Sequence, residues 1–337
     1  MNQKIIGPAA SEEDSAVDWP QAEVEQRQFT VSTAQHGMRV DRALADWVPE
    51  LSRSYLAQLV SDGHVQVQGR VIVKPAAKLS AGAQVELALV PTPAANAFRP
   101  EAVDFPVVFE DDDLLVINKP AGLVVHPGAG NWGGTLLNGL LHRDRRAADL
   151  PRAGIVHRLD KNTSGLMVVA KSRVAMTSLV AQLAAREVQR VYIAMAHGRS
   201  PLGHCFEVDQ AIGRDPKNRL RMGVVAAGKP AQTEARVLAA SEELGGVLML
   251  RCKLKTGRTH QIRVHMAWAG MPLVGDTLYG GREAWGLTHQ ALHAHDLALV
   301  HPVSGAHLHW WAPPPVHLCT ALAAAGLGYN AQALLTN

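Results

Sequence analysis

The sequence predicts an α+β protein with two domains, a small one followed by a larger one. Its 337 residues exceed the roughly 100 to 200 of an ordinary domain. A proline-bearing segment at residues 91–100 divides them unequally. In the larger part, stretches that alternate apolar and polar residues outnumber stretches with helical periodicity, which is typical of antiparallel sheets. We therefore expect a mixed, mainly antiparallel β-sheet flanked by helices and loops.

The first 28 residues are predicted to be a flexible acidic tail. They lack apolar periodicity and hold six acidic residues against two basic ones. Their first half also lacks the apolar stretch of a signal peptide. The longest apolar runs in the chain fall well short of the ~20 residues that span a bilayer. These features predict a cytoplasmic protein without a membrane segment.

Residues 29–90 are predicted to form the small domain. Short amphipathic stretches and turn residues at Asp62-Gly63 and Gln68-Gly69 define its elements. The expected elements are helices at 39–47 and 53–61 and strands at 64–67, 71–73 and 84–90. Residues 91–100, with three prolines, are predicted to be a linker to the large domain at 101–330.

The large domain shows clear strand and helix patterns. Residues 247–254 alternate, with Leu248, Leu250 and Cys252 on one face. Residues 188–196 alternate too, which predicts that Tyr192 lies on the exposed, polar face of its strand. The last helix has Thr259 as its expected N-cap. The expected elements are strands at 114–118, 166–170, 188–196 and 247–254 and helices at 135–142, 173–186 and 260–269.

Charge and cysteine content narrow the function classes. The net charge is +3, and because the tail is acidic, the rest of the chain is more basic than this value suggests. A basic body suits a polyanionic partner, although many proteins of this charge bind none. The three cysteines are far apart and form no CxxC pair, so neither a disulfide framework nor a cysteine zinc site is indicated.

Three segments concentrate reactive groups. In residues 154–165, Asp160 lies between Arg158 and Lys161, which favours an ionised carboxylate that can act as nucleophile or base. A structural ion pair explains the same charges equally well. Residues 255–265 predict a strand end that passes into an anion-binding helix start, or simply a capped surface helix. Tyr192 can stack on a base, although a single strand tyrosine is more often packing.

Taken together, these segments resemble the RNA pseudouridine synthases typified by ribosomal large subunit synthases A, C and D. The small domain resembles an S4-type RNA-binding domain. The glycine-bearing residues 126–131 and residues 151–154 are most similar to the D branch, which acts on the helix 69 hairpin loop of large-subunit ribosomal RNA. The matching motifs are NKPAGLVVHP (118–127), GIVHRLDKNTSGLMVVAK (154–171), KTGRTHQIRVH (255–265), GDTLYGG (275–281) and QALH (290–293).

The resemblance implies roles for individual residues. Asp160 corresponds to the catalytic aspartate, and Arg258 to the arginine that pairs with it. Tyr192 corresponds to the tyrosine that stacks on uracil, and Arg158 to the side chain that fills the gap left by the flipped uridine. The apolar residues Leu278 and Leu292 are expected to line the base pocket. Further substrate-binding candidates are His157, Lys255, His260, Gln261 and Arg263, and RNA-binding candidates in the small domain are Arg53, Lys74 and Lys78.

The resemblance also implies the partners and cofactors. The reaction is an isomerisation, so no redox cofactor or metal is expected. The expected partner is large-subunit ribosomal RNA or the pre-ribosomal large subunit, bound by a monomer. There are two departures from the pattern. Asn162 in place of aspartate is a mild change, whereas the short 281–290 segment leaves the exact RNA target open.

The same sequence is compatible with two other functions. Sixteen histidines, with His293/His295 and His307/His309 spaced to share strand faces, suggest a metal-dependent hydrolase, but no HExxH motif or carboxylate cluster accompanies them. A non-catalytic RNA-binding or ribosome-assembly protein with an inactive synthase fold is the second alternative. The presence of Asp160, Arg258 and Tyr192 argues against that loss of activity.

Overall fold

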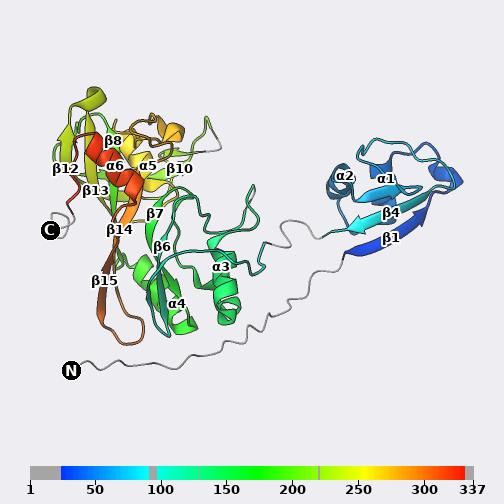
Figure 1. The fold of residues 1–337 in the computed structure, drawn as a ribbon, viewed down its shortest axis with the longest axis horizontal. Helices are drawn as coiled ribbons and strands as arrows, with labels where there is room; N and C mark the ends of the chain where they lie inside the picture. The colour runs from blue at the N-terminus through cyan, green and yellow to red at the C-terminus, as the bar shows by residue number, and fades with distance from the viewer. Residues whose placement is uncertain (1–23, 91–96, 129, 219–220, 331–337) are drawn as a thin grey trace, which may run out of the picture. The chain divides into compact units, whose positions relative to one another are not determined.

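The computed structural model describes residues 24–90, 97–128, 130–218 and 221–330. Its contacts divide the chain into two compact units, Met1–Ala95 and Asn96–Asn337 (Figure 1). The predicted α+β class is confirmed, because each unit packs helices against its own sheet. Within the described residues, no helix is long and apolar enough to cross a membrane.

The first unit is a four-stranded antiparallel sheet, in the order β1-β4-β2-β3, with two helices packed on it. Leu44 of α1, Leu56 of α2 and Leu87 of β4 are fully buried in its core. The predicted helices and strands are present, with ends shifted by a few residues. The elements are β1 (Glu25–Thr30), η1 (Thr33–Gln35), α1 (Val40–Trp47), α2 (Arg53–Ser61), β2 (Val65–Val67), β3 (Arg70–Val71) and β4 (Gln84–Leu89).

Two predicted boundaries of this unit need correction. The prediction extends the flexible tail through residue 28, but β1 already begins at Glu25 and pairs along its whole length with β4. The polar sequence EQRQFT has no apolar alternation that would predict this edge strand, because its pairing is made by backbone groups. The prediction also extends the linker through residue 100, but the Asn138 side chain donates hydrogen bonds to the carbonyls of Ala97 and Arg99. Residues 1–23 and 91–96 lie outside the described residues.

The second unit is built on one large mixed sheet. Its strand order is β5-β6-β7-β14-β8-β13-β12-β9, with β15 also paired to β14, and only the β7–β14 pair is parallel. The strands are β5 (Val107–Glu110), β6 (Leu114–Lys119), β7 (Ser164–Ala170), β8 (Gln189–His197), β9 (Cys205–Asp209), β12 (Gln232–Ser241), β13 (Val247–Leu254), β14 (Leu292–Val300) and β15 (His307–Trp311), and β10 (Ile212–Arg214) and β11 (Met222–Val224) form a separate hairpin.

Helices cover both faces of this sheet (Figure 1). On one face, α3 and α5 pack against strands that include β8 and β13. On the other face, α4 packs near β6 and β7, and α6 packs near β8 and β13. The helices are α3 (Leu136–Arg143), α4 (Arg173–Ala184), α5 (Gln261–Trp268) and α6 (Val316–Ala324), with 3-10 turns η2 (Arg145–Asp149), η3 (Pro151–Gly154), η4 (Glu243–Gly245) and η5 (Thr277–Tyr279).

The parallel pairing of β7 with β14 requires a glycine. Gly165 has φ of +115°, and a Cβ there would lie 2.2 Å from the Ala294 carbonyl oxygen. No other residue type allows β14 to approach so closely. This contact fixes where β7 begins, and therefore where the polar loop in front of it lies.

Candidate active site

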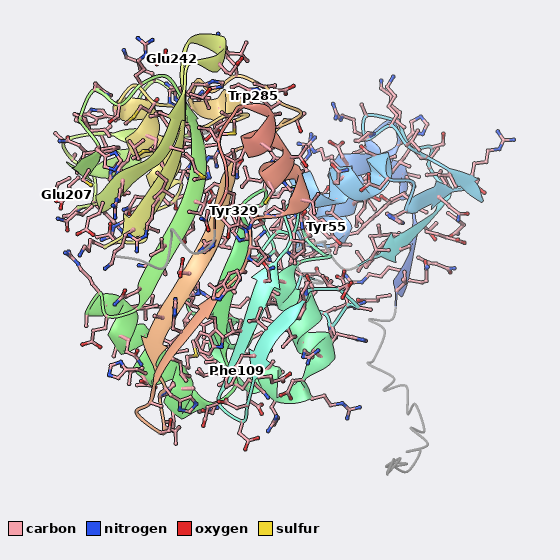
Figure 2. The ribbon with its side chains drawn as sticks, turned by 60° about the vertical axis from the view of Figure 1, so that its left-hand side comes forward. Tyr55, Phe109, Glu207, Glu242, Trp285 and Tyr329 are labelled. Carbon is pink, nitrogen blue, oxygen red and sulfur yellow. The ribbon has the colours of Figure 1, made fainter. Side chains whose placement is uncertain are left out.

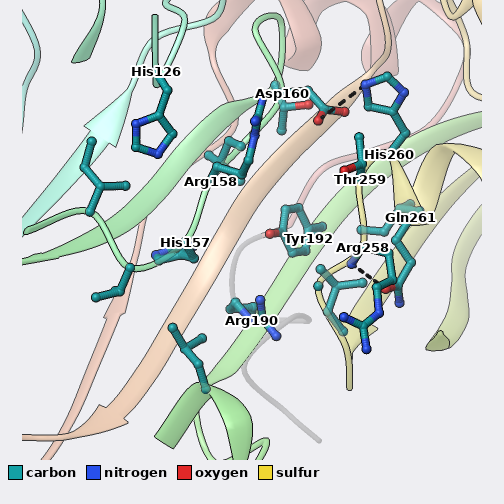
Figure 3. A pocket seen from close by; sticks show the side chains of 18 of the residues that line it. His126, His157, Arg158, Asp160, Arg190, Tyr192, Arg258, Thr259, His260 and Gln261 are labelled. Carbon is teal, nitrogen blue, oxygen red and sulfur yellow. Dashed lines mark hydrogen bonds and ion pairs between the residues drawn. The ribbon is translucent and has the colours of Figure 1, made fainter. Parts of the chain in front are cut away.

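A cavity of about 700 Å³ lies in the large unit, beside the loop that precedes β7. This volume is within the usual range for ligand sites. Figure 3 shows side chains from several elements converging on it. The lining residues include 155–160 of the loop, Arg190 and Tyr192 of β8, residues 257–263 at the start of α5, and Leu292 of β14. Segments far apart in the sequence thus meet at one site.

Asp160 is held in this cavity by an arginine of α5. The Nη1 of Arg263 donates to Asp160 Oδ2 at 3.0 Å. The same guanidinium donates through Nε and Nη2 to the two carboxylate oxygens of Asp276, at 2.7 and 2.9 Å. Burial by itself would lower the pKa of Arg263, but Asp276 and then Asp160 outweigh it and raise that pKa above its ordinary value. Arg263 is therefore a fixed cation between two carboxylates.

The predicted pairing of Arg258 with Asp160 is wrong in this structure. Arg258 lines the cavity, but its Nε donates to the Pro230 carbonyl oxygen at 3.0 Å, and its backbone N–H donates to Gln261 Oε1. The reason is its place in the chain. Arg258 lies in the turn before α5, whereas Arg263 lies in the first turn of the helix and is buried toward Asp160. The acidic residue of the GDTLYGG motif, Asp276, is the sequence signal for this arrangement, because a buried carboxylate needs a nearby cation.

The start of α5 also differs from the prediction. The N-cap is His260, not Thr259, and its φ of +58° turns the chain sharply into the helix. The Tyr279 hydroxyl accepts from the Met222 backbone N–H and lies 2.8 Å from His260 Nδ1, so we assign its proton to that bond. This leaves Nε2–H facing Asp160, 3.8 Å away. Burial lowers the pKa of His260, against the opposing effect of Asp160.

Tyr192 lines the cavity, but it does not lie on an exposed face. It is buried, because β8 is a central strand with helices on both faces of the sheet. The alternation in its sequence therefore separates two buried layers rather than core from solvent. Burial raises the pKa of the Tyr192 phenol, so the ring stays neutral and suitable for stacking.

A buried lysine, Lys119, binds the backbone of the Asp160 loop. The Nζ of Lys119, at the end of β6, donates to the carbonyl oxygens of Pro120, Leu123 and Lys161 at 2.8 to 3.0 Å. Burial lowers the pKa of Lys119 to about 7. The three carbonyls use all three protons of an ammonium group. This bond set ties the NKPAG segment to the residue after Asp160, a link that the sequence alone does not indicate.

The remaining predicted substrate contacts fall into two groups. Arg158, His157, His260 and Leu292 line the cavity. Gln261 lines it too, but its amide is committed to Thr256, Arg258, Gln232 and Thr233. The predictions for Leu278 and Lys255 are not supported. Leu278 is exposed and outside the lining, and Lys255 pairs with Glu234 on the neighbouring strand.

Three of the four histidines that suggest a metal site have other partners. His293 bonds the Ser164 hydroxyl and the Ala312 carbonyl, at 2.8 and 3.0 Å. His295 bonds Asp296 and the hydroxyl of Tyr329, which Figure 2 labels. His309 bonds the other oxygen of Asp296 at 2.9 Å. In the described part of the chain, no group of three or more possible ligands is arranged to hold a metal ion.

The predicted RNA contacts of the first unit lie close to one another. Arg39 is the backbone bridge partner of Lys78, and both Arg39 and Arg53 bond the buried Asp41. Lys74 and Lys78 are exposed. Arg39 is not among the residues predicted from the sequence. Lys74 is close to the other three cations in the fold, because the Asp41 backbone N–H donates to the carbonyl of Pro75, the next residue. We call these four cations the Arg39 surface.

Comparisons with known proteins identify both units. Residues 113–268 match the family described as RNA pseudouridylate synthase, and residues 38–85 match the S4 domain. Ribosomal large subunit pseudouridine synthase D of Escherichia coli K12 is 48% identical over 299 residues, which cover 85% of this chain and 90% of that protein. The Neisseria meningitidis protein of the same name is 46% identical over 309 residues, or 87% and 81% of the two chains.

A solved structure agrees with these matches. Human RNA pseudouridylate synthase domain containing 1 is 28% identical and superimposes with a TM-score of 0.51. The superposition covers 64% of this chain and 85% of that one. The fold of this chain is therefore similar to that of a solved protein whose name contains RNA pseudouridylate synthase.

Proposed function

Because the chain belongs to the RNA pseudouridylate synthase family and is a pseudouridine synthase, we propose that it isomerises uridines of large-subunit ribosomal RNA, in the helix 69 loop, with Asp160 as the catalytic carboxylate. The observation that carries this proposal is the Asp160–Arg263–Asp276 cluster beside Tyr192 in one cavity. Similarity to proteins named synthase D supports the choice of RNA.

The site provides what the isomerisation needs. A target uridine flips out of the RNA into the cavity, where its base stacks on Tyr192. Arg158 is exposed at the cavity and fills the vacated space with its planar guanidinium. Asp160, held in place by Arg263, attacks the ribose C1′.

The reaction then closes without any other reactant. The C1′–N1 bond breaks, uracil turns within the cavity, and its C5 forms a new bond to C1′ as the Asp160 carboxylate leaves. The C5 proton is lost and N1 gains one, so there is no net oxidation or hydrolysis. One carboxylate suffices because no water has to be activated, in contrast to the two-carboxylate glycosidases.

Mapping of pseudouridine in ribosomal RNA tests this function. A strain that lacks the gene is expected to lose pseudouridine from the helix 69 loop and to regain it with the wild-type gene. The variant Asp160→Asn keeps the shape of the side chain but not its charge, so turnover should fall by about 10⁴ or more while the protein still binds RNA. Unchanged helix 69 modification in the deletion strain would refute the target, and an active Asp160→Asn would refute the mechanism.

A further inference from the structure

One buried arginine of the cavity, Arg190, has no counter-charge within the part of the chain that the structure describes. Arg190 of β8 is only 8% exposed. Among the described residues, no hydrogen bond or ion pair to its side chain is found, and its buried Nε lacks any partner. Taking a guanidinium out of water without a partner is unfavourable. Such a group in a ligand cavity indicates that the missing partner is the ligand.

The position of Arg190 shows which part of a ligand it meets. It lies two residues before Tyr192 on the same strand and therefore on the same face. Figure 3 shows it beside Tyr192, on the side away from Asp160. Its Nη1 is 2.8 Å from the place that a Cβ on Gly257 would occupy, so the absence of a side chain there keeps the guanidinium uncovered.

The other arginines of the cavity are differently placed. Arg258 and Arg263 already bond protein groups. Arg152 and Arg158 are exposed at the cavity, where Arg152 suits a phosphate and Arg158 suits the gap left by the flipped base. Arg190, by contrast, is buried next to the aromatic ring on which a base stacks. It therefore fits the base itself, and an arginine donates well to carbonyl oxygens and to anions.

We propose that Arg190 binds the uracil base and stabilises the negative charge that uracil carries after the C1′–N1 bond breaks. This inference rests on the proposed function. When Asp160 bonds to C1′, the electron pair of the C1′–N1 bond stays on N1 and spreads to O2 and O4. Arg190 remains protonated and donates to this anion. When C5 bonds to C1′, the pair returns to the Asp160 carboxylate. A fixed cation in a water-poor site is an effective way to stabilise such developing charge.

Chemical rescue of Arg190→Ala tests the proposal. Removal of the guanidinium is expected to lower kcat by about 10² to 10³, as for the loss of a preorganised donor to a transition-state anion. Affinity for RNA should change by less than about threefold, because the phosphate contacts remain. Guanidinium ion at millimolar concentration should restore at least part of kcat, whereas urea, which has a similar shape but no charge, should not.

The matched control is Arg251→Ala. Arg251 lies on the neighbouring strand β13, and its Nε is also buried without a partner among the described residues, but it does not line the cavity. Its removal should leave kcat within a fewfold of the wild-type value and should show no rescue by guanidinium. Equal decreases in kcat for the two variants would indicate a structural role and would overturn the proposal.

Other outcomes are also decisive. A rise in KM with unchanged kcat would make Arg190 a contact of the RNA backbone, and a failure of guanidinium to rescue would make its role structural; both overturn the proposal. If Arg190→Ala does not fold, Arg190→Gln keeps much of the side chain without its charge, and wild-type kcat in that variant would likewise overturn the proposal. Wild-type protein and Asp160→Asn run on the same RNA keep the hypotheses apart. An inactive wild type refutes the proposed function, whereas an active wild type with an equally active Arg190→Ala refutes only this inference.

Discussion

The two units each contain an aspartate held by arginine, but they bury opposite partners. In the first unit, the Asp41 side chain is 6% exposed, and its partners Arg39 and Arg53 are 50% and 54% exposed. In the second unit, the Arg263 side chain is 7% exposed, and its partner Asp160 is 18% exposed. In each cluster the buried side chain fixes the position of its partner, and the more exposed partner is the one that can contact RNA. Asp41 thus presents two cations, and Arg263 presents one carboxylate.

The hydrogen bonds of the two buried side chains, Asp41 and Arg263, are also distributed differently. Asp41 receives four hydrogen bonds from its two arginines, and the bonds from Arg39 are the main reason that its pKa is lowered. Arg263 instead directs two of its donors to the buried Asp276 and only one to Asp160. Asp160 therefore keeps an oxygen, Oδ1, that receives no bond from Arg263 and lies 3.8 Å from the imidazole Nε2 of His260. This is the arrangement expected of a carboxylate that must react.

Among the changes that test this comparison, the largest decrease in kcat is expected from replacing Arg263, the buried partner of Asp160. Arg263→Lys keeps the charge but cannot bond Asp276 and Asp160 together, so kcat should fall by about 10² to 10³. Asp276→Asn should lower kcat too, but less, because Arg263 keeps Asp160. The matched control is Arg258→Lys, whose native side chain donates to a carbonyl oxygen rather than to a carboxylate, and its kcat should fall by less than about tenfold.

Steady-state turnover on ribosomal RNA, with melting temperature measured on each variant, checks this order. A severe decrease in Arg258→Lys together with near-normal Arg263→Lys would show that the arginines exchange roles when RNA binds. Arg263 would then hold Asp160 only in the protein without RNA, and Arg258 would hold it during catalysis.

A smaller effect is expected from the exposed side of the Asp41 cluster. Arg53→Gln and Lys78→Gln each remove one cation from the Arg39 surface, so binding should weaken for all RNA sequences. The slope of log affinity against log salt should decrease by ~0.7 to 0.9 for each phosphate that is no longer neutralised. At saturating RNA, kcat should not change. Asp41→Asn should weaken binding as well, because both arginines are then without their anchor. A salt slope that stays constant would show that the surface does not contact phosphate.

The sequence locates the reactive segments better than the contacts between them. Asp160 can be found because its neighbours in the chain are charged and its loop precedes an apolar strand. Its partner is predicted as Arg258 rather than Arg263, because two arginines in one motif cannot be separated without the turn at His260. Arg190 does not stand out in the sequence at all. Its isolation results from which strands neighbour β8, and that depends on long-range pairing.

The smallest expected effect is on stability in acid, and it concerns a histidine that the catalytic pair does not use. His157 accepts a hydrogen bond from the Val168 backbone N–H at 3.0 Å, and burial, with the charge of Arg190, lowers the pKa of His157 to about 3. In the unfolded chain this pKa is about 6.5. Between these values the unfolded state binds more protons, so the stability that neutral His157 contributes is present above about pH 6.5 and is lost as pH falls toward 3.

The variant His157→Gln can still accept a hydrogen bond from the Val168 backbone N–H but does not titrate. From pH 7 to pH 5 its melting temperature should fall by ~2 to 4 °C less than that of the wild type, after allowance for the partial exposure of His157. Equal falls in the two proteins, measured by thermal unfolding at both pH values, would show that His157 binds its proton equally well in the folded and the unfolded chain.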